Sequence, residues 1–298
     1  GYIRISGILR EAHQMFTKLS YTWEIMQSSW EVLKRDKALV LFPLFSSIAC
    51  LLVIASFAVP VLVEIHAAPK SMGHLSPDQR IAGWIYLFAF YFVTYFVITF
   101  FNVGVVSCAA CRMAGGEPTF GTGMRAAMQR IHLIAGWALV SATVGMVLKL
   151  IETYNRRFGR IIAGILGAAW TIITFLVVPV LVIEQKGPFD ALKESAALLK
   201  KTWGPQILGN FSFGLIFFLL FLPAVVAIGL AVYLMAGVSA SLGLMLLAVA
   251  IVYIIALALI QSTLHSIFQA ALYMYTQGVP DETHAFPVKL LKDAMYNG

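Results

Sequence analysis

The chain has 298 residues, of which 60% are hydrophobic and 12% are charged. A soluble globular domain carries roughly 45–50% apolar and about 25% charged residues, so lipid must solvate much of this surface. The formal net charge of +7 is spread over short polar segments. No basic folded domain of the kind that binds nucleic acid is therefore expected. The composition predicts an all-α, polytopic integral membrane protein.

Residues 1–20 are interpreted as an N-terminal extension that precedes the membrane domain. Residues 21–298 are then expected to form a single six-span domain, which ends in a short cytoplasmic tail at residues 276–298.

Six apolar runs are long enough, or nearly so, to cross about 30 Å of hydrocarbon, which takes about 20 helical residues. They are Leu39–Val63, Ile81–Cys111, Ile131–Leu148, Ile161–Ile183, Gln206–Ala236 and Leu242–Tyr275. The last two are expected to form a long hairpin. Six crossings place most Lys and Arg residues on the side of both termini, although the loop Glu152–Arg160 carries basic residues on the other side. The positive-inside rule then predicts the cytoplasmic (inner) membrane, with both termini in the cytoplasm.

Amphipathic helices are predicted before the first, third and fifth spans, on the cytoplasmic face. The third of these helices follows Pro188, where apolar residues recur every three or four positions. One interpretation is a repeated unit of surface helix plus two spans, at residues 21–111, 119–183 and 188–275; the other is that cytoplasmic loops are simply often amphipathic. The basic residues of the three helices are expected to contact anionic lipid headgroups. They are Lys34, Arg35, Lys37, Arg125, Arg130, Lys193, Lys200 and Lys201.

The last span carries Gln261, His265 and Gln269 at successive i+4 positions, hence on one helical face. Counting from the outer loop, His265 falls at or beyond the cytoplasmic headgroups. This favours a solvated or packed interfacial stripe over a polar pocket or the entrance to a conduit. Cys108 and Cys111 have the spacing of half a zinc site, but a second pair is missing from the sequence, so no metal and no other cofactor is expected.

Three stretches carry a resemblance to a known family: Ser29–Pro43, Arg112–Phe120 and Ala169–Glu184. They resemble an uncharacterised prokaryotic family of six-span membrane proteins, catalogued as a domain of unknown function. That family is in turn similar to the membrane domain attached to some glycerophosphodiester phosphodiesterases. The resemblance implies a fold and a membrane location, and it supplies no catalytic residues.

Catalysis is not expected, because the sequence contains no P-loop, GxSxG or HExxH motif. The leading hypothesis is a non-catalytic accessory or organising protein that binds membrane lipids and another membrane protein or a second copy of itself. The alternative is a transporter or channel for a small or amphiphilic solute, with the Gln261–His265–Gln269 face at its inner mouth. A membrane-embedded enzyme of lipid metabolism is the third hypothesis.

Overall fold

In the computed structural model, residues 26–67, 76–154, 158–237 and 239–278 are described, and this part of the chain contains helices and no strand. Six stretches are long and apolar enough to cross a membrane, which confirms the predicted all-α, six-span class. They are Lys37–Glu64, Pro77–Met113, Ile131–Tyr154, Phe158–Ile183, Ile216–Gly237 and Ala240–Thr276. The predicted N-terminal extension and most of the predicted tail lie outside the described residues.

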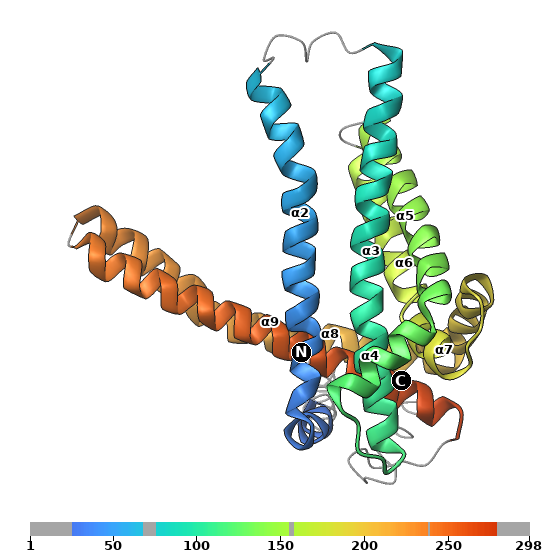
Figure 1. The fold of residues 1–298 in the computed structure, drawn as a ribbon. Coiled ribbons are helices and arrows are strands. Elements are labelled where there is room, and N and C mark those ends of the chain that lie inside the picture. The colour runs from blue at the N-terminus through green and yellow to red at the C-terminus, as the bar shows by residue number, and fades with distance from the viewer. Residues whose placement is uncertain (1–25, 68–75, 155–157, 238, 279–298) are drawn as a thin grey trace, which may run out of the picture. The chain divides into compact units, whose positions relative to one another are not determined.

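The elements follow one another along the chain with short connections (Figure 1). Residues 26–35 are helical and form the N-terminal segment. After it come the 3₁₀ helix η1 (Lys37–Val40) and the helices α2 (Leu41–Ala67), α3 (Pro77–Met113), α4 (Phe120–Gln129), α5 (Ile131–Tyr154), α6 (Phe158–Ile173), α7 (Val177–Ile183), α8 (Pro188–Gly237) and α9 (Ala240–Thr276).

The chain divides into two compact units. The first unit comprises the described parts of residues 1–40, 109–117 and 201–298, and the second unit comprises those of residues 41–108 and 118–200. Each unit therefore combines segments that are far apart in sequence, and α3 and α8 each contribute to both.

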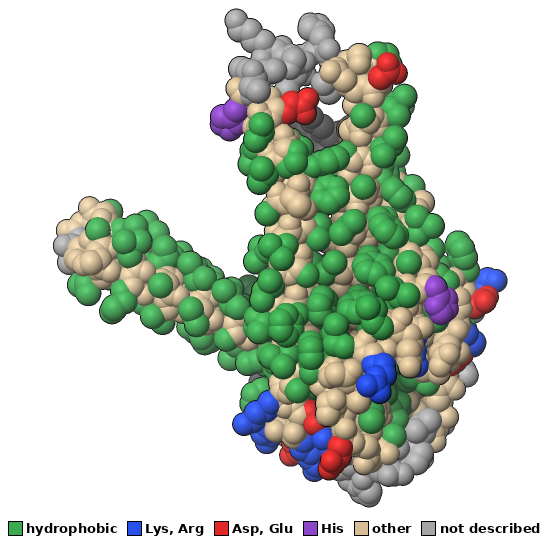
Figure 2. Space-filling model, in the orientation of Figure 1, with side chains coloured by type: hydrophobic (Ala, Val, Ile, Leu, Met, Phe, Trp, Pro, Cys, Tyr) green, Lys and Arg blue, Asp and Glu red, His purple; other side chains and the backbone are tan. Residues whose placement is uncertain are grey.

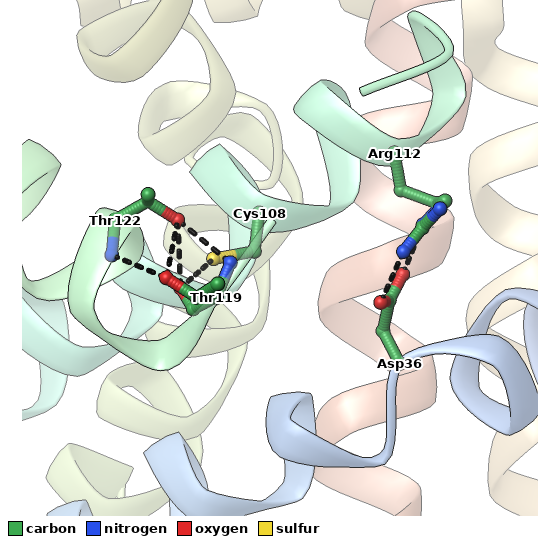
Figure 3. Close-up of polar contacts among 5 residues, drawn as sticks. All are labelled: Asp36, Cys108, Arg112, Thr119 and Thr122. Atoms are coloured by element: carbon green, nitrogen blue, oxygen red, sulfur yellow. Dashed lines mark hydrogen bonds and ion pairs between the residues drawn. The ribbon is translucent and has the colours of Figure 1, made fainter. Parts of the chain in front are cut away.

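In the second unit, α4 packs closely on α2 and α3 because two glycines make room for one aromatic ring. A Cβ on Gly123 would lie 2.4 Å from Cζ of Phe42, and one on Gly104 would lie 2.5 Å from its Cε1. The ring of Phe120 lies 4.7 Å from that of Phe42. Thr119 caps α4 in a reciprocal capping box with Thr122 (Figure 3). The amphipathic helix predicted before the third span is therefore α4, and the Thr119 cap fixes its start at Phe120.

The fourth span is broken at residues 174–176, between α6 and α7. Pro179 lies four residues after Phe175, so it has no N–H to donate to the carbonyl of Phe175, and its ring crowds that carbonyl. The hydroxyl of Ser195 on α8 fills the break. It accepts from the backbone N–H of Leu176 at 3.1 Å and donates to the carbonyl of Ile173 at 2.6 Å. The break was not predicted, and it leaves these backbone groups satisfied inside apolar surroundings.

The chain leaves the fourth span through a tight turn, as the sequence predicts. The last residue of α7 is Ile183, Gln185 takes the left-handed φ of 53°, and α8 starts at Pro188. Ala191, Ser195 and Leu198 form the buried face of the new helix, whereas Phe189 is 68% exposed. The predicted apolar stripe that begins at Phe189 therefore differs from the face that packs inside the protein.

In the first unit, α8 and α9 form the predicted long hairpin and lie side by side (Figure 1). Close approach depends on Gly243, where a Cβ would lie 2.6 Å from the carbonyl oxygen of Ala231. Further along, the hydroxyl of Tyr253 donates to the carbonyl of Leu220 at 2.9 Å. Hydrophobic side chains cover the visible lengths of α2, α3 and the hairpin, while charged side chains gather near helix ends (Figure 2). This distribution is typical of helices solvated by lipid.

Candidate lipid-binding site

A bidentate ion pair attaches the N-terminal segment to the end of α3 within the first unit (Figure 3). Asp36 directly follows the helical residues 26–35, and Nε and Nη2 of Arg112 donate to its two carboxylate oxygens. The Asp36 side chain is 9% exposed and that of Arg112 is 20% exposed. Parallel bonds of this kind fix orientation as well as distance. The ion pair therefore fixes the end of the N-terminal segment against the end of α3.

The chain turns sharply after α3 ends at Met113, so Arg112 lies in the last turn of this helix. Gly115 has a φ of 79°, and the N–H of Gly116 donates to the carbonyl of Cys111 at 2.9 Å. A Cβ on Gly116 would lie 2.7 Å from Sγ of Cys111. The positive φ favours glycine at Gly115, and a side chain at Gly116 would crowd Cys111.

Two apolar grooves flank Trp30 in the same unit. The first, called the Trp30 groove, has a volume of about 360 Å³. Its walls come from the N-terminal segment, α8 and α9, and consist of Met26, Gln27, Trp30, Phe217, Leu220, Leu257, Ile260 and Leu264. Apart from one amide, every side chain in this lining is apolar, which suits a hydrocarbon chain.

The second groove, called the lysine groove, has a volume of about 380 Å³. It is lined by Trp30, Leu33, Lys34, Lys37, Val40, Ala256, Leu259 and Ile260. Trp30 and Ile260 belong to both grooves, so the 41% exposed indole of Trp30 lies between them. An interfacial Trp beside lysines is typical of the headgroup boundary.

Lys34 and Lys37 line the lysine groove mainly through their apolar stems. Lys34 and Lys37 are both exposed, and the lining contains no acidic side chain. The one carboxylate between them in sequence, Asp36, is occupied by Arg112. Both lysine side chains are exposed, so a phosphate at the edge of this groove would meet their ammonium groups, with the exposed carboxylate of Glu31 one turn before Lys34.

The other basic residues predicted to contact headgroups are not brought into this site. Arg35 is exposed beside it but does not line either groove. Arg125 and Lys193 are exposed in the second unit, where Lys193 lies 3.9 Å from Asp190. The side chains of Lys200 and Lys201 lie outside the described part of the chain. Headgroup binding by these residues stays a prediction.

Arg130 has a structural role in the second unit. Its Nε donates to the carbonyl of Val182 at 3.0 Å, and its Nη1 donates to the carbonyl of Ala126 at 3.0 Å. Burial lowers the pKa of the Arg130 guanidinium from its usual value. Two of its nitrogens are thus directed into the protein, which leaves less of the group for a headgroup than the sequence suggests.

The predicted polar face of the last span lies in the more buried half of α9. Gln261 and His265 are half-buried, and Gln269 is 8% exposed. Ile267 and Phe268, beside Gln269, are fully buried. Gln269 is therefore packed rather than solvated, and neither apolar groove is lined by any of the three polar residues.

The described residues contain no group of three or more His, Cys, Asp or Glu side chains that could hold a metal ion. Cys108 is buried with its Sγ 3.5 Å from the carbonyl oxygen of Thr119, whereas Cys111 is exposed (Figure 3). The two thiols of the Cys-x-x-Cys spacing therefore occupy different environments.

The six apolar helices indicate a multi-pass helical membrane protein. The chain belongs to a family of unknown function (DUF6159), which matches residues 81–282. No curated protein matches the chain, and no solved structure matches it.

Proposed function

We propose that the protein is a non-catalytic lipid-binding membrane protein that acts as an accessory or organising subunit. The observation that carries this proposal is the pair of apolar grooves around Trp30, one of which has Lys34 and Lys37 in its lining. The acyl chains of one anionic phospholipid would lie in the grooves, and its phosphate would lie between the two lysines.

The lysines supply the selectivity of such a site. An acyl chain that moves from bilayer to groove leaves one apolar solvent for another, so the hydrophobic effect contributes little. Each Lys near an anionic headgroup contributes about 1 kcal/mol. Two lysines would then favour an anionic over a neutral lipid by about 2 kcal/mol, or roughly thirtyfold in affinity.

The proposed location is the cytoplasmic membrane, with both termini in the cytoplasm. Lys34 and Lys37 stand at the start of the first candidate span, and this orientation would place them at the anionic cytoplasmic leaflet. The membrane-protein partner, or a second copy of this chain, is part of the same proposal. We also propose that this family is related to the membrane domain attached to some glycerophosphodiester phosphodiesterases, in which case the partner would be an enzyme that acts on glycerophosphodiesters.

The direct test is lipid binding by the full chain with Lys34→Gln and Lys37→Gln. The protein is delipidated in mild detergent and titrated with phosphatidylglycerol, and bound lipid is counted by native mass spectrometry. We expect roughly thirtyfold weaker binding in the double variant. Lys193→Gln is the matched control, because its side chain is 81% exposed and lines neither groove. Equal affinity in the double variant and the control would reject the site.

Transport of a small or amphiphilic solute is the second candidate, and the buried polar side chain of Gln269 with its neighbour His265 favours it. A polar face inside a membrane helix is by default a candidate for function. Solute uptake into vesicles that contain the protein tests this, with His265→Ala and Gln269→Ala as variants. Uptake that is unchanged in both variants would exclude a conduit along this face.

A further inference from the structure

A further cavity, of about 330 Å³, lies in the second unit near the C-terminal end of α5. It lies among α3, α5 and α6 and differs from the apolar grooves in having charged and aromatic walls. Its lining consists of Tyr91, Tyr95, Gly145, Leu148, Lys149, Glu152, Arg160, Ala163 and Gly164. From this lining we propose that the cavity binds the headgroup of a zwitterionic phospholipid, that is, a phosphate ester bearing an ammonium group.

The charges at the cavity have the arrangement that such a headgroup needs. Lys149 lies 3.0 Å from Glu152, and Nε of Arg160 lies 3.9 Å from the same carboxylate. Two cations and one anion thus share a small space. The lysine and arginine would hold the phosphate, and the carboxylate would hold the ammonium group.

The aromatic wall completes the ammonium side of the site. Tyr91 and Tyr95 lie one turn apart on α3, with ring centroids 6.3 Å apart. A Cβ on Gly145 would lie 3.4 Å from the hydroxyl oxygen of Tyr95, so glycine on α5 lets the rings lie close to that helix. Tyrosine rings attract alkylammonium groups through their negative faces.

These ion pairs are expected to add little to the stability of the fold. The side chains of Lys149, Glu152 and Arg160 are 44%, 36% and 76% exposed. Ion pairs this exposed contribute little to folding. They lie at a helix end, beside the exposed apolar side chains Leu150 and Ile161, along which acyl chains would run.

The test is headgroup selectivity, measured on the full chain in detergent by calorimetric titration with dihexanoyl phosphatidylethanolamine and dihexanoyl phosphatidylglycerol. The titrations use the full chain with Lys34→Gln and Lys37→Gln, so that the proposed anionic-lipid site around Trp30 does not contribute. This protein is expected to prefer the ethanolamine lipid. Lys149→Gln and Arg160→Gln each remove a phosphate partner and are expected to weaken binding of both lipids about tenfold. Because Arg160 is so exposed, its substitution leaves the fold intact.

Glu152→Gln distinguishes this site from a simple anion site. Loss of the carboxylate is expected to weaken the ethanolamine lipid about tenfold while binding of the glycerol lipid stays equal or strengthens. A glycerol lipid preferred in the Lys34→Gln, Lys37→Gln background, or a Glu152→Gln substitution that affects both lipids alike, would overturn the proposal. Lys193→Gln is the control here too. Because Lys34 and Lys37 are already replaced in this background, the outcome does not depend on the proposed lysine-groove site.

Discussion

Arg112 donates two hydrogen bonds to Asp36, the one carboxylate that stands between Lys34 and Lys37 in the sequence. The ion pair therefore has two effects in the first unit. It fixes the end of the N-terminal segment, and it neutralises the carboxylate that stands between the two lysines.

The first prediction separates these two effects. Arg112→Gln leaves Asp36 buried without its cation and is expected to destabilise the protein by about 3 kcal/mol. It is also expected to weaken binding of phosphatidylglycerol several-fold, because an unneutralised carboxylate then repels the phosphate. The double variant Asp36→Asn with Arg112→Gln is expected to restore lipid affinity. Lipid titration of the three proteins checks this, and an affinity that stays low in the double variant would contradict the electrostatic account.

The second prediction concerns Ser195 at the break in the fourth span. Ser195→Ala leaves the N–H of Leu176 and the carbonyl of Ile173 without this hydroxyl, and unsatisfied buried groups cost about 1–3 kcal/mol each. A lower midpoint of thermal unfolding in detergent is expected. Thr143→Ala serves as the control, because the Thr143 hydroxyl is exposed and bonds only to Leu139 of its own helix. Similar midpoints for the two variants would show that the hydroxyl has no such role.

The third prediction concerns the close packing of α4. In Gly123→Ala the new methyl group would lie 2.4 Å from Phe42 and 2.9 Å from the backbone oxygen of Gly104. Because a backbone oxygen cannot rotate away, the variant is expected to lose roughly 1–3 kcal/mol of stability. Gly83→Ala is the control, since no atom lies within 4 Å of its Cβ position. Alanine is there expected to stabilise the helix by up to about 1 kcal/mol, and loss of stability in both variants would reject the steric explanation.

The fourth prediction is a pH dependence at the turn before α8. The ammonium of Lys186 bonds to the carboxylates of Glu184 and Glu194, which raises the pKa of Lys186 above its usual value. A raised pKa stabilises the fold at all pH values below about 10.5, and the contribution is lost as the pH rises through the higher folded-state pKa. Thermal unfolding of the wild type and Lys186→Gln should therefore differ at pH 8 and converge at strongly alkaline pH. A difference that persists unchanged there would show that the charge is not responsible.

Features that depend on local pattern were predictable from the sequence. The six spans follow from apolar runs, the hairpin of α8 and α9 from the short connection between two of them, and the start of α8 from Pro188. Boundaries were less accurate: α5 was expected to end near Leu148 and continues to Tyr154. Charged residues such as Lys149 and Glu152 are typical of a loop in sequence, but here they lie on the surface of the continuing helix.

Features that depend on distant partners were not predictable. The fourth span was expected as one run at Ile161–Ile183, and only the fold shows that the helix breaks at residues 174–176 and that Ser195 bonds to the backbone there. Asp36 and Arg112 are 76 residues apart, and no periodicity connects them. On α8, the exposed apolar stripe that begins at Phe189 and the buried face that begins at Ala191 both repeat every three or four residues. Composition does not show which of two apolar faces meets lipid and which meets protein.

The hydrogen bonds of Ser195 also set an order of events during synthesis. Ile173 and Leu176 precede Ser195 by 22 and 19 residues, so their backbone groups leave the ribosome before their partner exists. At about 5–20 residues per second, this interval lasts roughly 1–4 s. During that time the fourth span must either stay outside the hydrocarbon or keep water at its break. Insertion of the fourth span can become complete only when the first turns of α8 have emerged. The fourth span and the start of α8 are therefore expected to insert together.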